Sequence, residues 1–229
     1  MTGTDLKDGR RRKGWTQENA ARRLGVSQPY LSLLENGTRR VPEKLAHQAA
    51  GLFGLSPARL PMKNAGWSVQ VEETNTLASD LAALRYPGLS HLESVRKKNP
   101  AEVLLSALSV KNLDARLTEA LPWILVRYAD LDWEWLFCAA KVNDLQNKLG
   151  FLISVARRFA ENLGKHDTAT LLRDQETVLE RSRLMKEETL CHDSLSQAER
   201  RWLKSNRTAE ARHWNLLTDL APEHLTHGL

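Results

Sequence analysis

The fold of the N-terminal part of the chain is decided by residues 16–37, which read TQENAARRLGVSQPYLSLLENG. Thr16 is a good N-cap, because its side chain can accept a hydrogen bond from a backbone N–H of the first helical turn. The eight residues after it place their apolar members on one face of a helix, and Gly25 then supplies the positive-φ position of a tight turn. This pattern predicts a helix over residues 17–24 that ends in a sharp turn.

A second short helix is predicted directly after this turn, over residues 28–35. Ser27 can cap it, Pro29 suits its first turn, and Leu31 and Leu34 are three positions apart and therefore face inward together. An Asn-Gly pair ends it. Two short helices joined by three residues, with a glycine in the turn, meet the steric requirements of a helix-turn-helix.

Further helices flank this pair. Residues 6–12 are predicted to form a helix closed by Gly14, and residues 43–53 a helix that is followed by Gly54-Leu55-Ser56-Pro57. The segment resembles the phage Cro and repressor family, also called the XRE family, and the resemblance is carried by Thr16-Gln17, Ala21, Leu24-Gly25-Val26-Ser27, Leu31-Ser32, Leu34-Glu35-Asn36-Gly37, Arg39 and Pro42. It implies a five-helix domain over residues 1–60 whose third helix lies in the major groove of double-stranded DNA.

The resemblance also implies a set of DNA-contacting residues. Gln17 and Ser27 would contact phosphate or sugar, Gln28 would read a base edge, and Arg39 and Arg40 would hold the DNA backbone. The other candidates, at or near the DNA surface, are Pro29, Tyr30, Ser32 and Leu33. The chemistry agrees, since a glutamine amide can pair with adenine N6 and N7. Because many relatives carry polar base-reading residues where this chain has proline and leucine, part of the specificity is assigned to DNA shape.

Some of these residues have a second interpretation. Tyr30 either contacts a phosphate or covers the neighbouring helix. The basic run at residues 10–13 either faces DNA or is a solvated helix face, because only part of it can point in one direction. Glu35 is expected to make an internal hydrogen bond or ion pair, since a carboxylate that faced phosphates would be repelled.

The charge of the chain is unevenly distributed. Residues 1–60 hold eleven Lys and Arg against five Asp and Glu, a balance of +6, whereas the remainder holds 22 against 23, a balance of −1. All of the excess positive charge therefore lies in the N-terminal quarter, where it can neutralise phosphates and release counterions.

Residues 61–75 are interpreted as a linker, in which residues 67–72 alternate apolar and polar side chains and suit a short strand. From residue 76 to residue 229 the apolar pattern is helical, which makes the whole chain all-α with a larger C-terminal helical domain. Pro122 is expected either to kink a helix or to begin a new one. Longer helices are predicted over residues 133–162, 168–190 and 194–220, the last of them with a capping box from Ser196 to Glu199.

The sequence contains no motif of a catalytic, metal or cofactor site. Phosphate-binding glycine loops, His-x-x-x-His pairs and nucleophile elbows are missing, and Cys138 and Cys191 lack the spacing of metal ligands. We therefore expect no enzyme activity, no cofactor and no metal. No apolar run is long enough to span a bilayer and no signal pattern begins the chain, so we expect a cytoplasmic protein without a membrane partner.

These observations favour a sequence-specific transcriptional regulator that binds operator DNA as a homodimeric repressor of its own operon. The alternative is an antitoxin-like protein whose helical C-terminal domain binds and neutralises a toxin-like partner while the N-terminal domain autoregulates. A third hypothesis is a ligand-responsive regulator in which an aromatic cluster holds a small effector. That cluster consists of Trp123, Tyr128, Trp133 and Trp135, although such a group is more often core or subunit interface.

Overall fold

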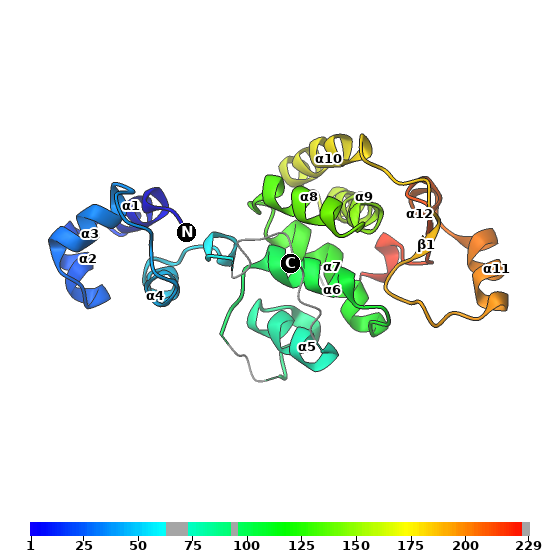
Figure 1. Cartoon of the computed structure of the whole chain (residues 1–229), viewed down its shortest axis with the longest axis horizontal. Coiled ribbons are helices and arrows are strands. Elements are labelled where there is room, and N and C mark those ends of the chain that lie inside the picture. The colour runs from blue at the N-terminus through cyan, green and yellow to red at the C-terminus, as the bar shows by residue number, and fades with distance from the viewer. Residues whose placement is uncertain (63–72, 93–95, 226–229) are drawn as a thin grey trace. The chain divides into compact units, whose positions relative to one another are not determined.

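The computed structural model describes residues 1–62, 73–92 and 96–225, and the chain divides into two compact units, residues 1–63 and 64–229 (Figure 1). We call the described part of the first unit the head and that of the second unit the body. The strand predicted over residues 67–72 lies outside the described residues. No helix in the described ranges has the length and apolar character needed to cross a bilayer.

The head consists of four α-helices and one 3-10 turn, in the order α1 (Gly3–Arg12), α2 (Gln17–Leu24), α3 (Gln28–Glu35), α4 (Glu43–Phe53) and η1 (Pro57–Arg59). The fifth helix implied by the resemblance is thus a single 3-10 turn. Helix α1 begins three residues earlier than predicted, because Thr2 and Asp5 form a capping box.

The core of the head is a single apolar cluster to which all four α-helices contribute. Its buried members are Leu6, Ala20, Ala21, Leu24, Leu31, Leu34, Leu45, Ala49, Phe53 and Leu55. The start of α1 lies against the end of α3 so closely that a Cβ at Gly3 would collide with the carbonyl oxygen of Leu34. Because Gly3 has no side chain, the start of α1 can pack directly against the backbone at the end of α3.

The body is built from helices and one short pair of strands. Its elements are α5 (Thr74–Ala83), η2 (Pro87–Leu89), α6 (Pro100–Ser109), α7 (Ala115–Arg127), α8 (Trp133–Val142), α9 (Gln146–Asn162), α10 (His166–Glu180), β1 (Glu188–Thr189), α11 (Gln197–Asn206), α12 (Ala209–His213), β2 (Leu216–Leu217) and η3 (Pro222–His224). Helix α9 is central, because it packs against α7, α8, α10 and α12 (Figure 1). Most of its side chains are buried.

Several predicted boundaries in the body are wrong. The helix predicted over residues 133–162 is two helices, because the side chain of Asn143 bonds the carbonyl of Ala139 at 2.7 Å and Asp144 adopts a left-handed φ of 55°. Helix α7 continues through Pro122, so a new helix does not begin there. The capping box at Ser196 and Glu199 is confirmed.

The two C-terminal helices predicted over residues 168–190 and 194–220 are also too long. Helix α10 stops at Glu180, and the region after residue 194 contains α11, α12 and a strand. The body is therefore not helical throughout: β1 and β2 pair in parallel, with Glu188 opposite Leu216 and Thr189 opposite Leu217. Pairing between segments so far apart in the sequence leaves no local pattern to predict it from.

The predicted aromatic cluster is divided in the structure. Trp123 and Tyr128 are 3% and 6% exposed and lie edge to face at 6.0 Å, and Tyr86 joins them at 5.3 Å from Trp123. The hydroxyl of Tyr128 donates to the carbonyl of Leu84 at 2.7 Å. Trp133 instead packs on Phe137 at 5.7 Å. Trp123, Tyr128 and Tyr86 are packed core, whereas Trp133 and Trp135 are half-buried. The packing of Trp123 and Tyr128 removes the support for an effector site between them.

A glycine on α9 makes room for the largest fully buried side chain of the body. Gly150 lies under the ring of Trp214, and a Cβ at this position would fall inside the van der Waals radius of the ring atoms. The indole N–H of Trp214 donates to the Ser154 hydroxyl at 2.8 Å, and that hydroxyl is 2.6 Å from a carboxylate oxygen of Glu176 on α10. The segment after α12 is thereby joined to α9 and α10.

We predict that Gly150→Ala destabilises the body by about 1–3 kcal/mol, the usual range for overpacking a filled core. The measurement is urea unfolding with hydrogen exchange resolved to peptides of α9. Gly51→Ala on α4 is the matched control, because a Cβ there meets no atom within 4 Å and its φ is not positive. The control should stabilise α4 by about 0.5–1 kcal/mol. An unchanged midpoint for Gly150→Ala would contradict the predicted clash.

Candidate nucleic-acid interface

The turn between α2 and α3 sets the angle at which α3 leaves the core. Gly25 has a φ of 67°, and the N–H of Val26 returns to the carbonyl of Ala21 at 3.0 Å. Ser27 then caps α3 through its hydroxyl, which accepts from the N–H of Tyr30 at 3.3 Å. The N-cap predicted at Ser27 and the positive φ predicted at Gly25 are both confirmed.

Helix α3 is held from its inner side and leaves its outer side open. Leu31 and Leu34 are fully buried, whereas Gln28, Pro29 and Leu33 are exposed. Because the buried leucines fix the rotation of the helix about its axis, the direction of the outer side chains is fixed as well. The structure thus collects these predicted residues on one exposed face.

One buried carboxylate connects three helices of the head. Glu35 at the end of α3 accepts two hydrogen bonds from Arg10 of α1, at 2.6 Å to Nε and 2.8 Å to Nη2, and one from Nε2 of Gln17 at 2.9 Å. The Glu35 side chain is 1% exposed and that of Arg10 is 11% exposed. The expected internal ion pair of Glu35 is therefore present, and Arg10 is withdrawn from the basic run at residues 10–13.

The same chain of hydrogen bonds reaches the outer face of α3. With Nε2 of Gln17 donating to Glu35, its Oε1 is free to accept from Nε2 of Gln28, and the distance is 2.8 Å. The buried carboxylate of Glu35 thereby sets the orientation of the Gln28 amide through two successive hydrogen bonds, with Gln17 between them. Sequence reasoning named both glutamines but missed this bond, for which residues eleven positions apart give no local signal.

The ionisation of the buried pair follows from these contacts. Burial alone would raise the pKa of Glu35, but the hydrogen bonds from Arg10 and Gln17, with the positive charges of Arg10 and Lys7, hold that pKa below its usual range. The hydrogen bond from Arg10 to Glu35 in turn raises the pKa of the guanidinium. Both groups are therefore charged at neutral pH.

The remaining predicted residues lie beside α3. Tyr30 is partly buried and packs against the core, which supports its interpretation as a cover for the neighbouring helix. The guanidinium carbon of Arg39 lies 6.0 Å from the centre of the Tyr30 ring, within the range of a cation–π contact. Arg39 and Arg40 are exposed, and Ser32 is half-buried.

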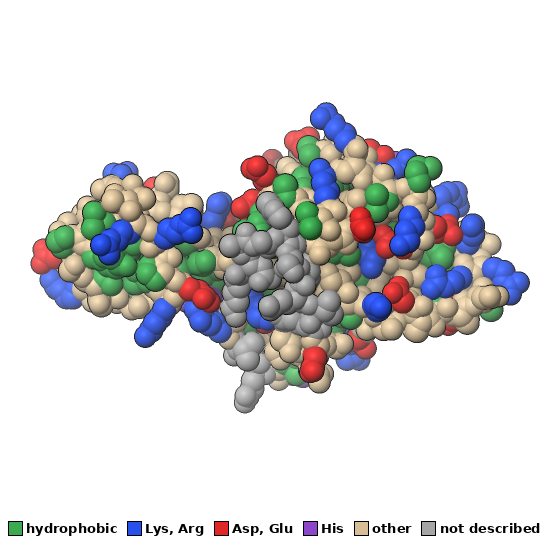
Figure 2. Space-filling model, in the orientation of Figure 1, with side chains coloured by type: hydrophobic (Ala, Val, Ile, Leu, Met, Phe, Trp, Pro, Cys, Tyr) green, Lys and Arg blue, Asp and Glu red, His purple; other side chains and the backbone are tan. Residues whose placement is uncertain are grey.

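Basic side chains dominate the solvent-exposed surface of the head. Figure 2 shows more Lys and Arg than Asp and Glu on its visible face, at the left of the view, whereas the two signs are interspersed on the body. Even without Arg10, the exposed basic residues of the head are Arg11, Arg12, Lys13, Arg22, Arg23, Arg39, Arg40, Lys44 and Arg59. Such a surface attracts a polyanion.

We predict that the head loses stability in acid through Glu35. Because its pKa is lowered in the folded state, the contribution of Glu35 is fully present above the ordinary carboxyl range of about pH 4–5 and is lost as the pH falls through the folded value. Glu35→Gln should cost about 3 kcal/mol at neutral pH, because Arg10 keeps a buried charge, and should reduce the loss in acid. NMR signals of α1 and α3 during urea titration at about pH 7 and about pH 4 measure both effects.

Glu18→Gln is the matched control for this prediction. Glu18 forms an ion pair with Arg22 at 3.4 Å, but both side chains are about three-quarters exposed, at 77% and 74%. The control should cost less than about 0.5 kcal/mol. Equal effects of the two substitutions would show that the buried carboxylate does not organise the head.

Comparison with known proteins agrees with this geometry. A family model described as a helix-turn-helix domain matches residues 3–61, about a quarter of the chain. No curated protein and no solved structure matches the chain significantly. Residues 3–61 are therefore a helix-turn-helix domain, which supports a DNA-binding regulator, and this match does not extend into the body.

Proposed function

We propose that the chain is a sequence-specific transcriptional regulator whose head inserts α3 into the major groove of double-stranded DNA, and that it acts as a homodimeric repressor of its own operon. The observation that carries the proposal is the position of Gln28. Its amide is exposed on the outer face of α3 and is oriented through Gln17 by a buried carboxylate. A side chain held in one orientation discriminates between bases without losing further conformational freedom on binding.

The amide of Gln28 retains the groups that adenine recognition requires. A glutamine amide has two N–H donors and one carbonyl acceptor, and the bond to Gln17 uses one donor. One N–H remains for adenine N7, and the carbonyl oxygen remains for the N6 amino group. Gln28 is therefore assigned as the base-reading residue.

Several neighbours suit contacts to the DNA backbone. Arg39 and Arg40 follow α3 and are exposed. Helix α2 begins at Gln17, and the backbone N–H groups of a first helical turn have no acceptor within the helix, so they can bind a phosphate. Ser27 lies at the corresponding end of α3. Such contacts fix the register of the protein on DNA and carry no sequence information directly.

Pro29 and Leu33 add apolar surface to the outer face of α3, where Leu33 is 40% exposed. An apolar side chain can contact a thymine methyl group but cannot hydrogen-bond a base. Fewer hydrogen bonds to bases leave a larger share of specificity to DNA shape.

A dimer is proposed on geometric grounds. Helix α3 has eight residues and is therefore about 12 Å long, so it reads only a few base pairs. Two-fold proteins extend their recognition by reading two half-sites about one helical turn apart. The body presents large apolar side chains to solvent, including Val178, Met185 and Trp202, which are 47%, 86% and 56% exposed and are available to join two copies.

The same exposed apolar side chains favour a second candidate function. An antitoxin-like protein would use the body to bind a toxin-like partner, with the head still repressing the operon. In the homodimeric repressor a second copy of the chain would cover these side chains, whereas in the antitoxin-like protein the toxin-like partner would cover them.

We predict that Gln28→Ala weakens binding to the preferred operator by about 1–3 kcal/mol and binding to random duplex very little, because only base readout is lost. Arg39→Ala should weaken binding to both DNAs to a similar extent and reduce the slope of affinity against salt, because it removes a phosphate contact. Fluorescence anisotropy over a salt series, with DNA from upstream of the gene and a shuffled duplex, measures both.

Arg181→Ala is the control for charge, since it removes an exposed cation from the body. It should leave both affinities unchanged. If Gln28→Ala weakened binding to the two DNAs equally, Gln28 would not be a base-reading residue. If the parent chain did not prefer its upstream region over the shuffled duplex, the proposed repression would be wrong.

A further prediction separates the two candidate functions. The purified chain should sediment at about twice 25.9 kDa and protect a pseudo-palindromic site, because each copy supplies one head. The measurement is sedimentation equilibrium of the chain with and without operator DNA. A monomeric chain that associates only with the product of a neighbouring, otherwise toxic gene would instead establish the antitoxin-like function.

A further inference from the structure

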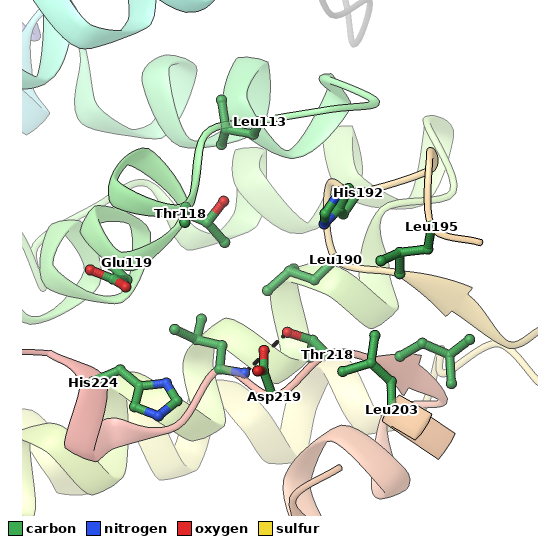
Figure 3. Close-up of a pocket in the computed structure, with 13 residues that line it drawn as sticks. Leu113, Thr118, Glu119, Leu190, His192, Leu195, Leu203, Thr218, Asp219 and His224 are labelled. Carbon is green, nitrogen blue, oxygen red and sulfur yellow. Dashed lines mark hydrogen bonds between the residues drawn. The ribbon is translucent and has the colours of Figure 1, made fainter. Parts of the chain in front are cut away.

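A pocket of about 460 Å³ opens in the body, away from the aromatic core (Figure 3). Its walls come from three parts of the chain, namely the start of α7, the segment from β1 into α11, and residues 217–224. In Figure 3, Thr118 and Glu119 lie on one wall, Asp219 and His224 lie on the opposite wall, and Leu190 lies between them. The volume falls within the range of about 300–1,000 Å³ that is usual for small-molecule sites.

The greater part of the lining is apolar. It is made of leucine side chains from all three walls, namely Leu113, Leu190, Leu195, Leu203, Leu217 and Leu220. A lining of this kind binds the apolar part of a ligand.

The groups of fixed charge that line the pocket are all negative. They are Glu119, which is half-buried, and Asp219, which is exposed, and the described lining contains no Lys or Arg. Neither carboxylate forms a hydrogen bond or an ion pair with any described residue. Two other partly buried carboxylates of the body are paired, Glu176 with Arg157 at 2.9 Å and Glu210 with Arg158 at 2.6 Å, whereas the Glu188 side chain has no such partner among the described residues.

A buried hydroxyl group also lines the pocket. Thr218 is 8% exposed, and its Oγ1 accepts from the N–H of Leu220 at 3.2 Å. The hydroxyl proton has no acceptor among the described residues, so Thr218 can donate to a ligand. Across the pocket, the Thr118 hydroxyl donates to the carbonyl of Asp114 at 3.1 Å and can accept from a ligand N–H.

We propose that this pocket binds a small organic cation, an amine with an apolar body. The ammonium group lies with the carboxylates of Glu119 and Asp219, and the apolar part lies among the leucines. A cation is favoured because it pairs a half-buried carboxylate that otherwise lacks a partner, whereas an anion would meet like charge. A metal ion is disfavoured, because the described residues contain no group of three or more His, Cys, Asp or Glu side chains that could hold one.

The binding of phenethylamine to the full chain tests the proposal, with 2-phenylethanol as a neutral probe of similar shape and 3-phenylpropionate as an anionic one. Calorimetry at about pH 8 keeps the amine protonated. We expect the amine to bind at least about tenfold more tightly than the alcohol and the anion not to bind.

Variants assign the binding to this pocket. Glu119→Gln and Asp219→Asn should each weaken phenethylamine binding about five- to tenfold and leave alcohol binding unchanged, because only charge is removed. Ala115→Trp, at an exposed position of the lining, should block all probes without a core substitution. Glu134→Gln is the matched control, since Glu134 is exposed and does not line the pocket.

Several outcomes would overturn the proposal. These are the absence of amine binding at millimolar concentration, equal binding of amine and alcohol, or an equal loss in Glu134→Gln and Glu119→Gln. Unfolding temperatures of the variants without ligand show whether each one is folded. The assay contains no DNA, so its result is independent of the function proposed for the head.

Discussion

The recognition surface of the head depends on one buried carboxylate. Glu35 lies where α1, α2 and α3 meet, and its two oxygens are occupied by Arg10 and Gln17. A buried carboxylate without such partners would be strongly unfavourable, whereas a satisfied one ties its donors to a single geometry. Arg10 thereby fixes α1 against α3, and Gln17 transmits the constraint to Gln28. The exposed residue that reads DNA in our proposal is thus positioned from the interior.

The body uses a related arrangement on a larger scale. Gly150 lets the ring of Trp214 approach α9, and the Ser154 hydroxyl links the indole N–H to Glu176, which also pairs with Arg157. The polar atoms of this cluster are satisfied by one another, so burial of a tryptophan and a carboxylate side by side does not leave an unpaired donor among them. The head and the body therefore each combine an apolar core with a polar network that joins helices.

The parts of the structure that the sequence predicts correctly are those with local causes. The ends of α2, α3 and α4 were predicted to the residue, because caps such as Thr16 and Ser27 and a left-handed glycine such as Gly25 act within one helical turn. The break between α8 and α9 was missed, since it depends on a side-chain bond of Asn143 and on a left-handed aspartate rather than on glycine or proline. The pairing of β1 with β2 was missed because it is not local.

The candidate site divides in the same way. The outward residues of α3 follow from helical periodicity, so Gln28 and Leu33 could be named from the sequence. The bond between Gln17 and Gln28 depends on the angle between two helices, which periodicity does not contain. The pocket of the body could not be predicted from the sequence, because Glu119, Leu190 and Asp219 come to line one pocket only when three distant segments fold together.

The two proposed sites belong to different units of the chain, since Gln28 lies in the head and the pocket lies in the body. Each contact that orients Gln28 comes from a residue of the head, since Glu35, Arg10 and Gln17 all lie within residues 1–62. The residues that line the pocket all belong to the body, and a ligand shifts an equilibrium only by the difference in its affinity for the two states. If the body joins two copies, as proposed, an effector bound in its pocket would act on how many heads are held together. Such an effector would change the affinity for an operator of two half-sites, because that affinity depends on how many heads bind together. The preference of a single head for one base over another would still be set by the residues of that head.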